Sequence, residues 1–376
     1  MSIVIIGSGQ AGYAVARELR RLDAGVPLVL LTRDGGESYP KPMLSVALAQ
    51  GKTPAALVLA SAGHMATTLD MQVVTGVEVT AIDRQARCVR TRQGDWPYRA
   101  LVLATGAEPV APALSGDGTG EVLAVNDLDS YARFRAQLPA GANVILLGAG
   151  LIGCEFACDL LASGHAVTLL DRAAWPAAGL LPQAAGTALL QALQQAGAGW
   201  HGNVNVLAVE RSGGGLAVVL DDGRRLAGDL VLSAIGLRPR TALAAGAGLP
   251  CDHGILTDAD GVTADPCIAA LGDCAQPPSG WQPYIAPVAP LARRIAARLS
   301  GQIPVVAPVL PVPVAFKTLL HPVVVQPPLR PGSWSVLDGA AGVEMACTDA
   351  AGEVCGFVLT GAHAGKRGVW QGRLRA

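Results

Sequence analysis

Two groups of glycines have the spacing that binds a phosphate. Residues 7–12 (GSGQAG) and residues 148–153 (GAGLIG) both read G-x-G-x-x-G. In such a loop the first glycine permits a tight turn, the second lets backbone amides approach a pyrophosphate, and the third lets the next helix pack closely on a strand. The pyrophosphate then lies at the positive end of that helix. Two such loops predict that the chain binds two dinucleotides.

An acidic residue about twenty positions beyond such a loop would bind the ribose hydroxyls. Asp171 follows the second loop at about that distance. Its carboxylate would repel the 2′-phosphate of NADPH and therefore favours NADH, although the adjacent Arg172 could bind that phosphate instead. In the first half the strand ends near Thr32 and Arg33, and Asp34 comes later than the pattern requires. The partner of the first ribose therefore stays open.

Each glycine loop lies between an apolar strand and a helix. The elements predicted around the first loop are a strand at Ile3–Ile6, a helix ending at Leu22 and a strand at Val26–Leu31. Those predicted around the second are a strand at Val144–Leu147, a helix to about Ser163 and a strand at Val167–Leu170. Strand–helix–strand units of this kind give a parallel sheet with a right-handed crossover.

Both units are followed by segments that predict antiparallel strands. The segments are GVEVTAID and CVRTRQGDWPYRALVLATG after the first unit, and NVNVLAVE and LAVVLDDGRRLAGDLVLSAIG after the second. Asp222 and Gly223 predict a tight turn within the last of these. From about Val305 the chain is rich in proline and valine, with short β segments expected at Trp334–Leu337 and Val354–Thr360.

These patterns predict an α/β fold with two Rossmann-like dinucleotide-binding domains, each with an antiparallel β insertion, and a small C-terminal α+β domain. We assign residues 1–110 and 235–305 to the first dinucleotide-binding domain, residues 111–234 to the second, and residues 306–376 to the C-terminal domain. A chain of 376 residues is indeed too long for one hydrophobic core.

The composition argues against several classes of protein. A net charge of −1 gives no global attraction to nucleic acid. Mean hydropathy is +0.39, but the apolar run at residues 299–316 contains four prolines and cannot be a membrane-spanning helix. The N-terminus enters a strand directly, without a secretory leader, so we expect a cytoplasmic protein. The six histidines show no ligand spacing, so we expect no metal.

Two further patterns have structural interpretations. Cys154 and Cys158, four residues apart on a predicted helix, are expected to be small core residues rather than a redox pair. Residues 361–368 (GAHAGKRG) are similar to a P-loop, but one residue is missing between the glycines and no Ser or Thr follows Lys366. We expect a basic, exposed turn there.

Three more segments identify a family. They are LATG, which ends at Thr105 and Gly106, AIGLRPRT, which contains Gly236, and ALGDCA, which contains Asp273. Together with the two glycine loops, in this order over roughly residues 1–300, they resemble the pyridine nucleotide–disulfide oxidoreductase superfamily. The resemblance implies FAD in the first dinucleotide-binding domain and NADH in the second, with Asp273 hydrogen-bonded to the ribityl chain of FAD.

The stretch SYPKPMLS (residues 38–45) lies where disulfide reductases of this superfamily have their redox-active cysteines. This chain has no cysteine before Cys88, so an internal thiol relay is not expected there. YPKPMLS, GLIGCEFA and VAFKT together resemble the rubredoxin reductases and the related reductases of flavorubredoxin. That resemblance implies an ion pair between Lys41 and Glu155 near flavin N5, and places Lys317 near the pyrimidine edge of the flavin.

We therefore expect hydride transfer from NADH to flavin N5, followed by transfer of single electrons to rubredoxin. Reduction of a ferredoxin for an oxygenase, or of a flavorubredoxin, is the alternative. A non-enzymatic NADH-sensing flavoprotein is a third, but the chain shows no targeting segment or long insertion for it. A small acidic partner would need a basic surface, and turnover would then fall steeply with salt. Candidates for that surface are Arg293, Arg294, Arg298, Lys317, Lys366 and Arg367.

Lys41 and Glu155 are the expected catalytic residues. The residues expected to bind the two cofactors are Gly7, Ser8, Gly9, Gln10, Ala11, Gly12, Thr32, Arg33, Lys41, Val79, Thr105, Gly106, Gly148, Gly150, Gly153, Glu155, Asp171, Gly236, Asp273, Ile285 and Lys317.

Overall fold

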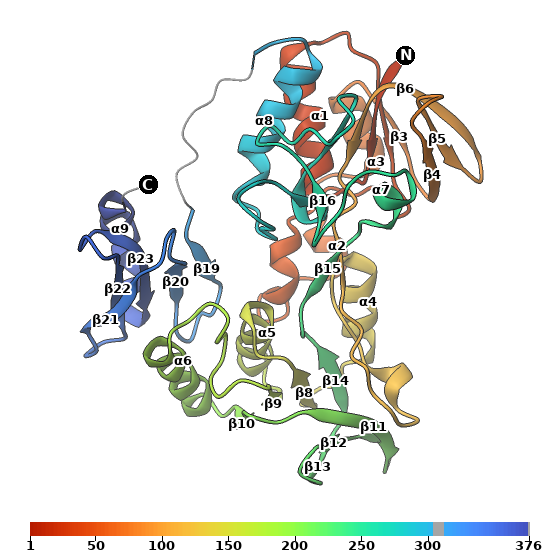
Figure 1. Cartoon of the computed structure of the whole chain (residues 1–376). Helices are drawn as coiled ribbons and strands as arrows, with labels where there is room; N and C mark the ends of the chain where they lie inside the picture. Colours follow the sequence, from red (N-terminus) through yellow and green to blue (C-terminus); the bar gives the residue numbers. More distant parts are fainter. Residues whose placement is uncertain (304–311, 375–376) are drawn as a thin grey trace. The chain divides into compact units, whose positions relative to one another are not determined.

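A computed structural model describes residues 1–303 and 312–374 (Figure 1). The chain divides into two compact units. The first consists of Met1–Lys41, Ala55–Glu108 and Leu237–Val309, and the second of Pro42–Pro54, Pro109–Gly236 and Leu310–Ala376. We describe each unit by itself, and the three-domain division expected from the sequence stays a prediction.

A parallel sheet forms the centre of the first unit. Its strands are β1 (Ser2–Ile6), β2 (Leu28–Leu31), β3 (Gln72–Val74), β6 (Gly94–Leu103) and β17 (Ile268–Ala270), in the order β3-β2-β1-β6-β17. Ile3 and Ile5 of β1 pack on one face of the sheet, whereas Val4 and Ile6 pack on the other. Burial of both faces is typical of parallel sheets and explains the continuous apolar run.

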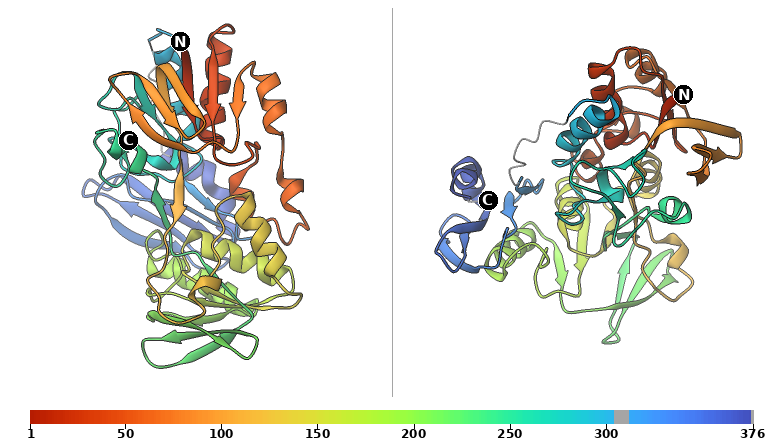
Figure 2. Two further views of the ribbon diagram at one scale, coloured as in Figure 1. Left: turned by 90° about the vertical axis from the view of Figure 1, so that its right-hand side faces the viewer. Right: turned by 45° about the horizontal axis from the view of Figure 1, so that its top comes forward.

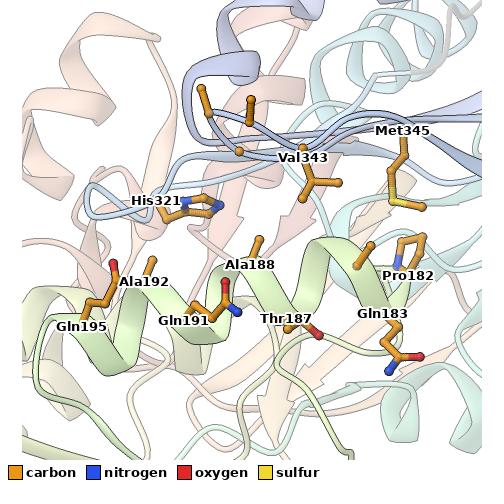
Figure 3. Close-up of a pocket in the computed structure, with 15 residues that line it drawn as sticks. Pro182, Gln183, Thr187, Ala188, Gln191, Ala192, Gln195, His321, Val343 and Met345 are labelled. Carbon is orange, nitrogen blue, oxygen red and sulfur yellow. The ribbon is translucent and has the colours of Figure 1, made fainter.

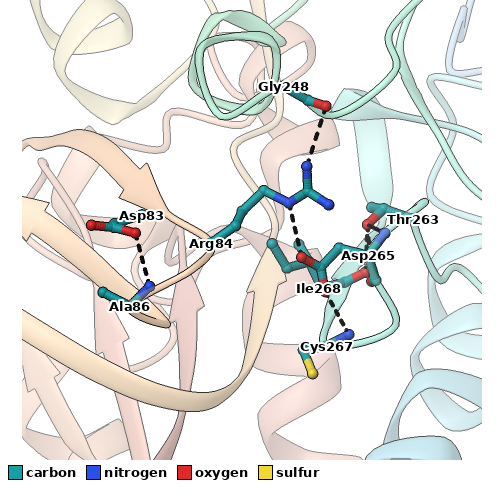
Figure 4. Close-up of polar contacts among 8 residues, drawn as sticks. All are labelled: Asp83, Arg84, Ala86, Gly248, Thr263, Asp265, Cys267 and Ile268. Atoms are coloured by element: carbon teal, nitrogen blue, oxygen red, sulfur yellow. Dashed lines mark hydrogen bonds and ion pairs between the residues drawn. The ribbon is translucent and has the colours of Figure 1, made fainter.

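Helices α1 (Gln10–Leu22) and α8 (Val288–Leu299) lie side by side on the first of these faces (Figure 1). The insertion β4 (Val79–Asp83) and β5 (Cys88–Thr91) continues antiparallel from β6, as predicted. Arg84, which follows β4, hydrogen-bonds through Nε to Asp265 at 2.8 Å and so joins this hairpin to the segment before β17 (Figure 4).

The second unit repeats the strand–helix–strand pattern. Strands β8 (Asn143–Leu147), β9 (Ala166–Leu170), β10 (Gly199–His201) and β14 (Leu230–Ser233) form a parallel sheet in the order β10-β9-β8-β14. The helices are α4 (Leu128–Gln137), α5 (Leu151–Ala162) and α6 (Gln183–Gln195). The insertion β11 (Val206–Ser212), β12 (Gly215–Leu220) and β13 (Arg225–Gly228) is the green antiparallel sheet in Figure 2.

The C-terminal part of the second unit is a five-stranded antiparallel sheet. Its strands are β19 (Val314–Phe316), β20 (Val323–Gln326), β21 (Ser333–Asp338), β22 (Glu344–Thr348) and β23 (Val354–Thr360), in the order β19-β20-β23-β22-β21. With η4 (Gly361–Lys366) and α9 (Arg367–Arg373) it confirms the small α+β domain. Residues 361–368 are mostly exposed or half-buried, as expected, but the expected turn is wrong, because the segment is helical and His363 is buried.

The remaining elements are short and mostly connect the sheets. They are η1 (Lys41–Ser45), α2 (Pro54–Leu57), α3 (Ala62–Thr68), β7 (Ala107–Pro109), η2 (Thr119–Glu121), β15 (Leu237–Pro239), α7 (Ala242–Gly246), β16 (Ile255–Leu256), η3 (Gly272–Cys274) and β18 (Ala275–Gln276). Within residues 1–303 and 312–374, no helix has the length and apolar character needed to cross a membrane.

Candidate functional site

Of the three glycines in the first loop, only Gly9 borders open space where a phosphate group could bind. A Cβ on Gly7 would lie 2.3 Å from the carbonyl oxygen of Ala104, and one on Gly12 would lie 2.0 Å from that of Gly7. At Gly9 a Cβ would meet nothing within 4 Å. Helix α1 begins directly after Gly9, and no side chain caps its first amides. These free donors beside open space fit the pyrophosphate of a dinucleotide.

The second loop is built in the same way. A Cβ on Gly148 would lie 2.8 Å from the carbonyl oxygen of Ala234, and one on Gly153 would lie 2.1 Å from that of Gly148. Gly150 again borders open space, and the first turn of α5 has no side-chain cap. In both loops the first and third glycines lie against carbonyl oxygens, and the second glycine borders open space. Both loops therefore fit the pyrophosphate of a dinucleotide.

An aspartate holds each loop in place. In the second half, the carboxylate of Asp171 accepts hydrogen bonds from the amides of Ala149 at 2.6 Å and Ala173 at 2.8 Å. In the first half, Oδ1 of Asp34 accepts from the hydroxyls of Ser8 at 2.8 Å and Thr32 at 2.6 Å. Asp34 thus joins the glycine loop to the end of β2, and the partner of the first ribose stays open.

Glu155 is a fully buried carboxylate on α5. It forms an ion pair with the ammonium group of Lys317, and it accepts a hydrogen bond from the Lys317 amide at 2.8 Å. The hydroxyl of Ser45 also donates to it. These three residues all belong to the second unit. The predicted ion pair between Glu155 and Lys41 joins residues of different units and stays a prediction.

Comparison with known proteins supplies the family. Residues 1–292 match the family described as pyridine nucleotide-disulphide oxidoreductase, and residues 304–374 match a rubredoxin binding C-terminal domain. The chain belongs to the pyridine nucleotide-disulphide oxidoreductase family. This membership confirms the predicted family and fold class, and the cofactors of this oxidoreductase are FAD and NADH.

The oxidoreductase has relatives along nearly its whole length. It is 41% identical to a rubredoxin-NAD(+) reductase of Alcanivorax borkumensis, over 96% of this chain and 94% of the relative. It is 38% identical to a nitric oxide reductase FlRd-NAD(+) reductase of Aeromonas hydrophila, over 96% and 92% of the two chains. Among solved structures, the putidaredoxin reductase–putidaredoxin complex has a TM-score of 0.89 at 26% identity, covering 99% of this chain and 93% of that one.

The cysteines of this oxidoreductase form no disulfide within the described residues. All eight cysteines are free, and six of them are buried. Burial raises the pKa of Cys154 well above its ordinary value and raises that of Cys158 to about 12, so neither thiol readily forms the nucleophilic thiolate. The expectation that both residues are small core residues is confirmed.

The backbone of Asp273 in the oxidoreductase is held in place by a hydrogen bond from a side chain. The indole nitrogen of Trp281 donates to the carbonyl oxygen of Asp273 at 2.8 Å, which fixes the short helix η3. The ammonium nitrogen of Lys41 lies 3.8 Å from Oδ2 of Asp273. Two residues expected at the flavin, Lys41 and Asp273, are therefore close to each other in the first unit. Sequence reasoning did not connect them.

The other predicted cofactor residues of the first unit have varied surroundings. Thr105 donates through its hydroxyl to the carbonyl oxygen of Arg240 at 3.0 Å. Gln10 is partly buried, and no hydrogen-bond partner is found for its Oε1 among the described residues. Ile285 is 43% exposed and Arg33 is exposed, whereas Ala11 and Val79 are half-buried. Gly106 and, in the second unit, Gly236 both adopt positive φ, which favours glycine.

Sequence reasoning missed Asp159 of α5. Its carboxylate accepts from the amides of Leu48 and Ala49, both at 2.9 Å, and so holds the segment that follows Ser45 against the helix. Burial raises the pKa of Asp159. The aspartate lies four residues after Glu155, so both carboxylates lie on one side of α5. That spacing is the signal that would have found it.

A groove of about 920 Å³ in the second unit is not part of this site. It lies between α6 and the loop that joins β21 to β22 (Figure 3). Its walls include Gln183, Thr187, Gln191 and Gln195, one face of α6, and His321 opposite them. None of the residues expected to bind a cofactor lines it.

Proposed function

We propose that this chain transfers electrons from NADH to a rubredoxin-type iron–sulfur protein. The observation that carries the proposal is the match of residues 304–374 to a rubredoxin binding domain, next to an oxidoreductase part with two dinucleotide loops. The family relatives named rubredoxin-NAD(+) reductase agree with it. Burial of six of the eight thiols supports an acceptor outside the chain, because a buried thiol does not readily form a reactive thiolate.

We assign the first glycine loop to the pyrophosphate of FAD and the second to that of NADH. The free amides after Gly9 and Gly150 would bind the phosphate oxygens, and Asp171 would accept hydrogen bonds from the ribose of NADH. Bound FAD supplies the chemistry that accepts a hydride and releases single electrons. The protein supplies position and electrostatics.

We assign Glu155, Lys317 and Lys41 to the electrostatics of the flavin. The ion pair with Glu155 fixes the ammonium group of Lys317 directly after β19, where its N–H groups would donate hydrogen bonds to a reduced flavin. Lys41, in η1 and near Asp273, would do the same from the first unit. Fixed charges cost no reorganisation when charge develops.

Anaerobic stopped-flow kinetics test this function. NADH-reduced protein is mixed with rubredoxin, with a [2Fe–2S] ferredoxin and with flavorubredoxin in separate experiments, and flavin reoxidation is followed by absorbance. We expect the fastest oxidation by rubredoxin. Slow oxidation by all three acceptors would contradict the proposal.

Flavorubredoxin is the second candidate acceptor. Relatives at 36–38% identity are named nitric oxide reductase FlRd-NAD(+) reductase. The solved structures also include a ferredoxin reductase from Rhodopseudomonas palustris. Its identity is 27% and its TM-score 0.86, covering 95% of this chain and 90% of that one.

We place the activity in the cytoplasm. The eight free cysteines support a reducing compartment.

A further inference from the structure

The turn between β19 and β20 exposes two neighbouring leucines. Leu319 is 77% exposed and Leu320 is 43% exposed. Among the large hydrophobic side chains of the described residues, only Ile303 is more exposed than Leu319. Single exposed apolar side chains are common on proteins. Whether this pair binds a partner therefore has to be argued from the residues around it.

The turn is held firmly by hydrogen bonds. Thr318 is buried, and its hydroxyl donates to the carbonyl oxygen of His321 at 2.7 Å. The amide of His321 donates to the carbonyl oxygen of Thr318 at 3.1 Å. The backbone of Leu320 also lies close to the thiol of Cys158 on α5. A partner that binds the leucines would therefore lose little conformational entropy in ordering them.

The turn directly continues the predicted flavin contact. Lys317, the residue before Thr318, is bound to Glu155 through both its backbone amide and its ammonium group. Helix α5 thus anchors the start of the turn through Glu155 and lies close to it again at Cys158. A protein that accepts electrons must bring its metal close to the flavin. We therefore look for the docking surface beside Lys317, the residue assigned above to the flavin.

The two ionisable residues that flank the leucines in the chain, Lys317 and His321, add little net charge. The ammonium group of Lys317 is neutralised by Glu155, and burial lowers the pKa of His321, which favours its neutral form. The turn also lies inside the segment matched to a rubredoxin binding domain. Two exposed leucines fit a partner that presents apolar side chains where it docks.

We propose that Leu319 and Leu320 form the apolar contact on which a rubredoxin-type partner docks. This inference rests on the proposed function and adds the surface that the partner uses. Complexes of electron carriers are small and short-lived, with total interfaces below about 1,200 Å². In such an interface a few anchors dominate the affinity, and two rigidly held leucines are suited to that role.

The double variant Leu319→Ser/Leu320→Ser tests the docking surface. We expect the KM for rubredoxin to rise by at least about tenfold, because the anchors carry most of the affinity. Turnover with NADH and ferricyanide, a small inorganic acceptor that needs no docking surface, should not change. The conservative variant Leu319→Met/Leu320→Met should keep a KM near that of the wild type.

Leu337→Ser is the matched control. Leu337 is 54% exposed on β21, at the opposite edge of the same sheet from β19. Its replacement should leave the KM for rubredoxin unchanged. An unchanged KM in the double serine variant, or an equal loss with ferricyanide, would overturn the docking inference alone. Failure of the wild type to reduce rubredoxin, with ferricyanide turnover intact, would instead overturn the proposed function.

Discussion

We propose that Asp171 determines the choice between NADH and NADPH. Its carboxylate, bound to the amides of Ala149 and Ala173, would face the 2′ position of the bound ribose. Replacing Asp171 with Ser removes the charge that repels a 2′-phosphate, and the adjacent Arg172 then becomes available to it. We expect the ratio of kcat/KM for NADPH to that for NADH to rise by at least about tenfold, which corresponds to roughly 1.4 kcal/mol.

Steady-state kinetics with both nucleotides measure that ratio. Asp221→Ser is a suitable control, because Asp221 also accepts amide hydrogen bonds but lies at the end of β12, outside the glycine loop. An unchanged ratio in the Asp171 variant would remove that residue from the nucleotide site.

Gly150 and Gly153 separate the two roles of glycine within one loop. A Cβ on Gly153 would collide with the carbonyl oxygen of Gly148, so Gly153→Ala should destabilise the protein by about 1–3 kcal/mol. A Cβ on Gly150 meets no protein atom within 4 Å. Gly150→Ala should therefore fold normally and bind NADH more weakly, because the methyl group enters the space expected for the pyrophosphate.

Urea unfolding and NADH titration distinguish these two outcomes. Normal stability of Gly153→Ala, or normal NADH binding by Gly150→Ala, would contradict the assignment. The sequence predicted both glycine loops and Asp171, because these depend on short spacings along the chain. It did not predict that the Ser8 hydroxyl donates to Asp34, or that the Ser45 hydroxyl donates to Glu155, because such pairs are brought together only by the tertiary fold.

At the scale of elements, Arg84 and Asp265 join the β4–β5 hairpin to the segment before β17 (Figure 4). Burial opposes ionisation of Asp265, but hydrogen bonds from Arg84 and from the Cys267 amide outweigh it and lower the pKa of Asp265. A lowered pKa in the folded state means that this pair stabilises the fold above about pH 4, and that its contribution is lost as pH falls through the folded pKa.

The variant Arg84→Met tests the hairpin contact. We expect it to lower the free energy of unfolding by about 1 kcal/mol at neutral pH, because solvent screens a partly exposed pair. The difference from the wild type should shrink as the pH is lowered below about 4. Urea unfolding at several pH values measures it, and Arg90→Met, an exposed pair in the same hairpin, serves as control. A difference independent of pH would exclude this linkage.

The elements themselves were predicted unevenly. Strong apolar periodicity placed β1, α1, β8 and α5 within one or two residues. Strand β2 begins at Leu28 rather than Val26, since Pro27 has no amide hydrogen to donate to the sheet. Helix α9 was not predicted, because four glycines near it argue against helix. It forms because Trp370 packs on Phe357, with ring centroids 5.8 Å apart, a contact that the local sequence does not contain.

At the scale of the whole molecule, the basic surface expected for an acidic partner is weaker than the sequence suggested. Of its six candidates, Lys317 pairs with Glu155 and Lys366 pairs with Glu344 in the second unit. In the first unit Arg294 lies 3.9 Å from Asp260. The sequence shows which residues are charged but not which of them form ion pairs. A count of cations therefore overestimates the positive electrostatic potential at the surface where a partner docks.

These ion pairs revise the expected dependence on salt. With three of six cations paired and an apolar turn as the docking contact, we expect kcat/KM for rubredoxin to fall less than about fivefold between ~50 and ~500 mM sodium chloride. Lys366→Gln removes a charge that is already neutralised and should not alter the slope, whereas Arg298→Gln removes an exposed one and should reduce it. A fall of about a hundredfold across this range would show that electrostatic attraction, and not the leucine turn, dominates docking.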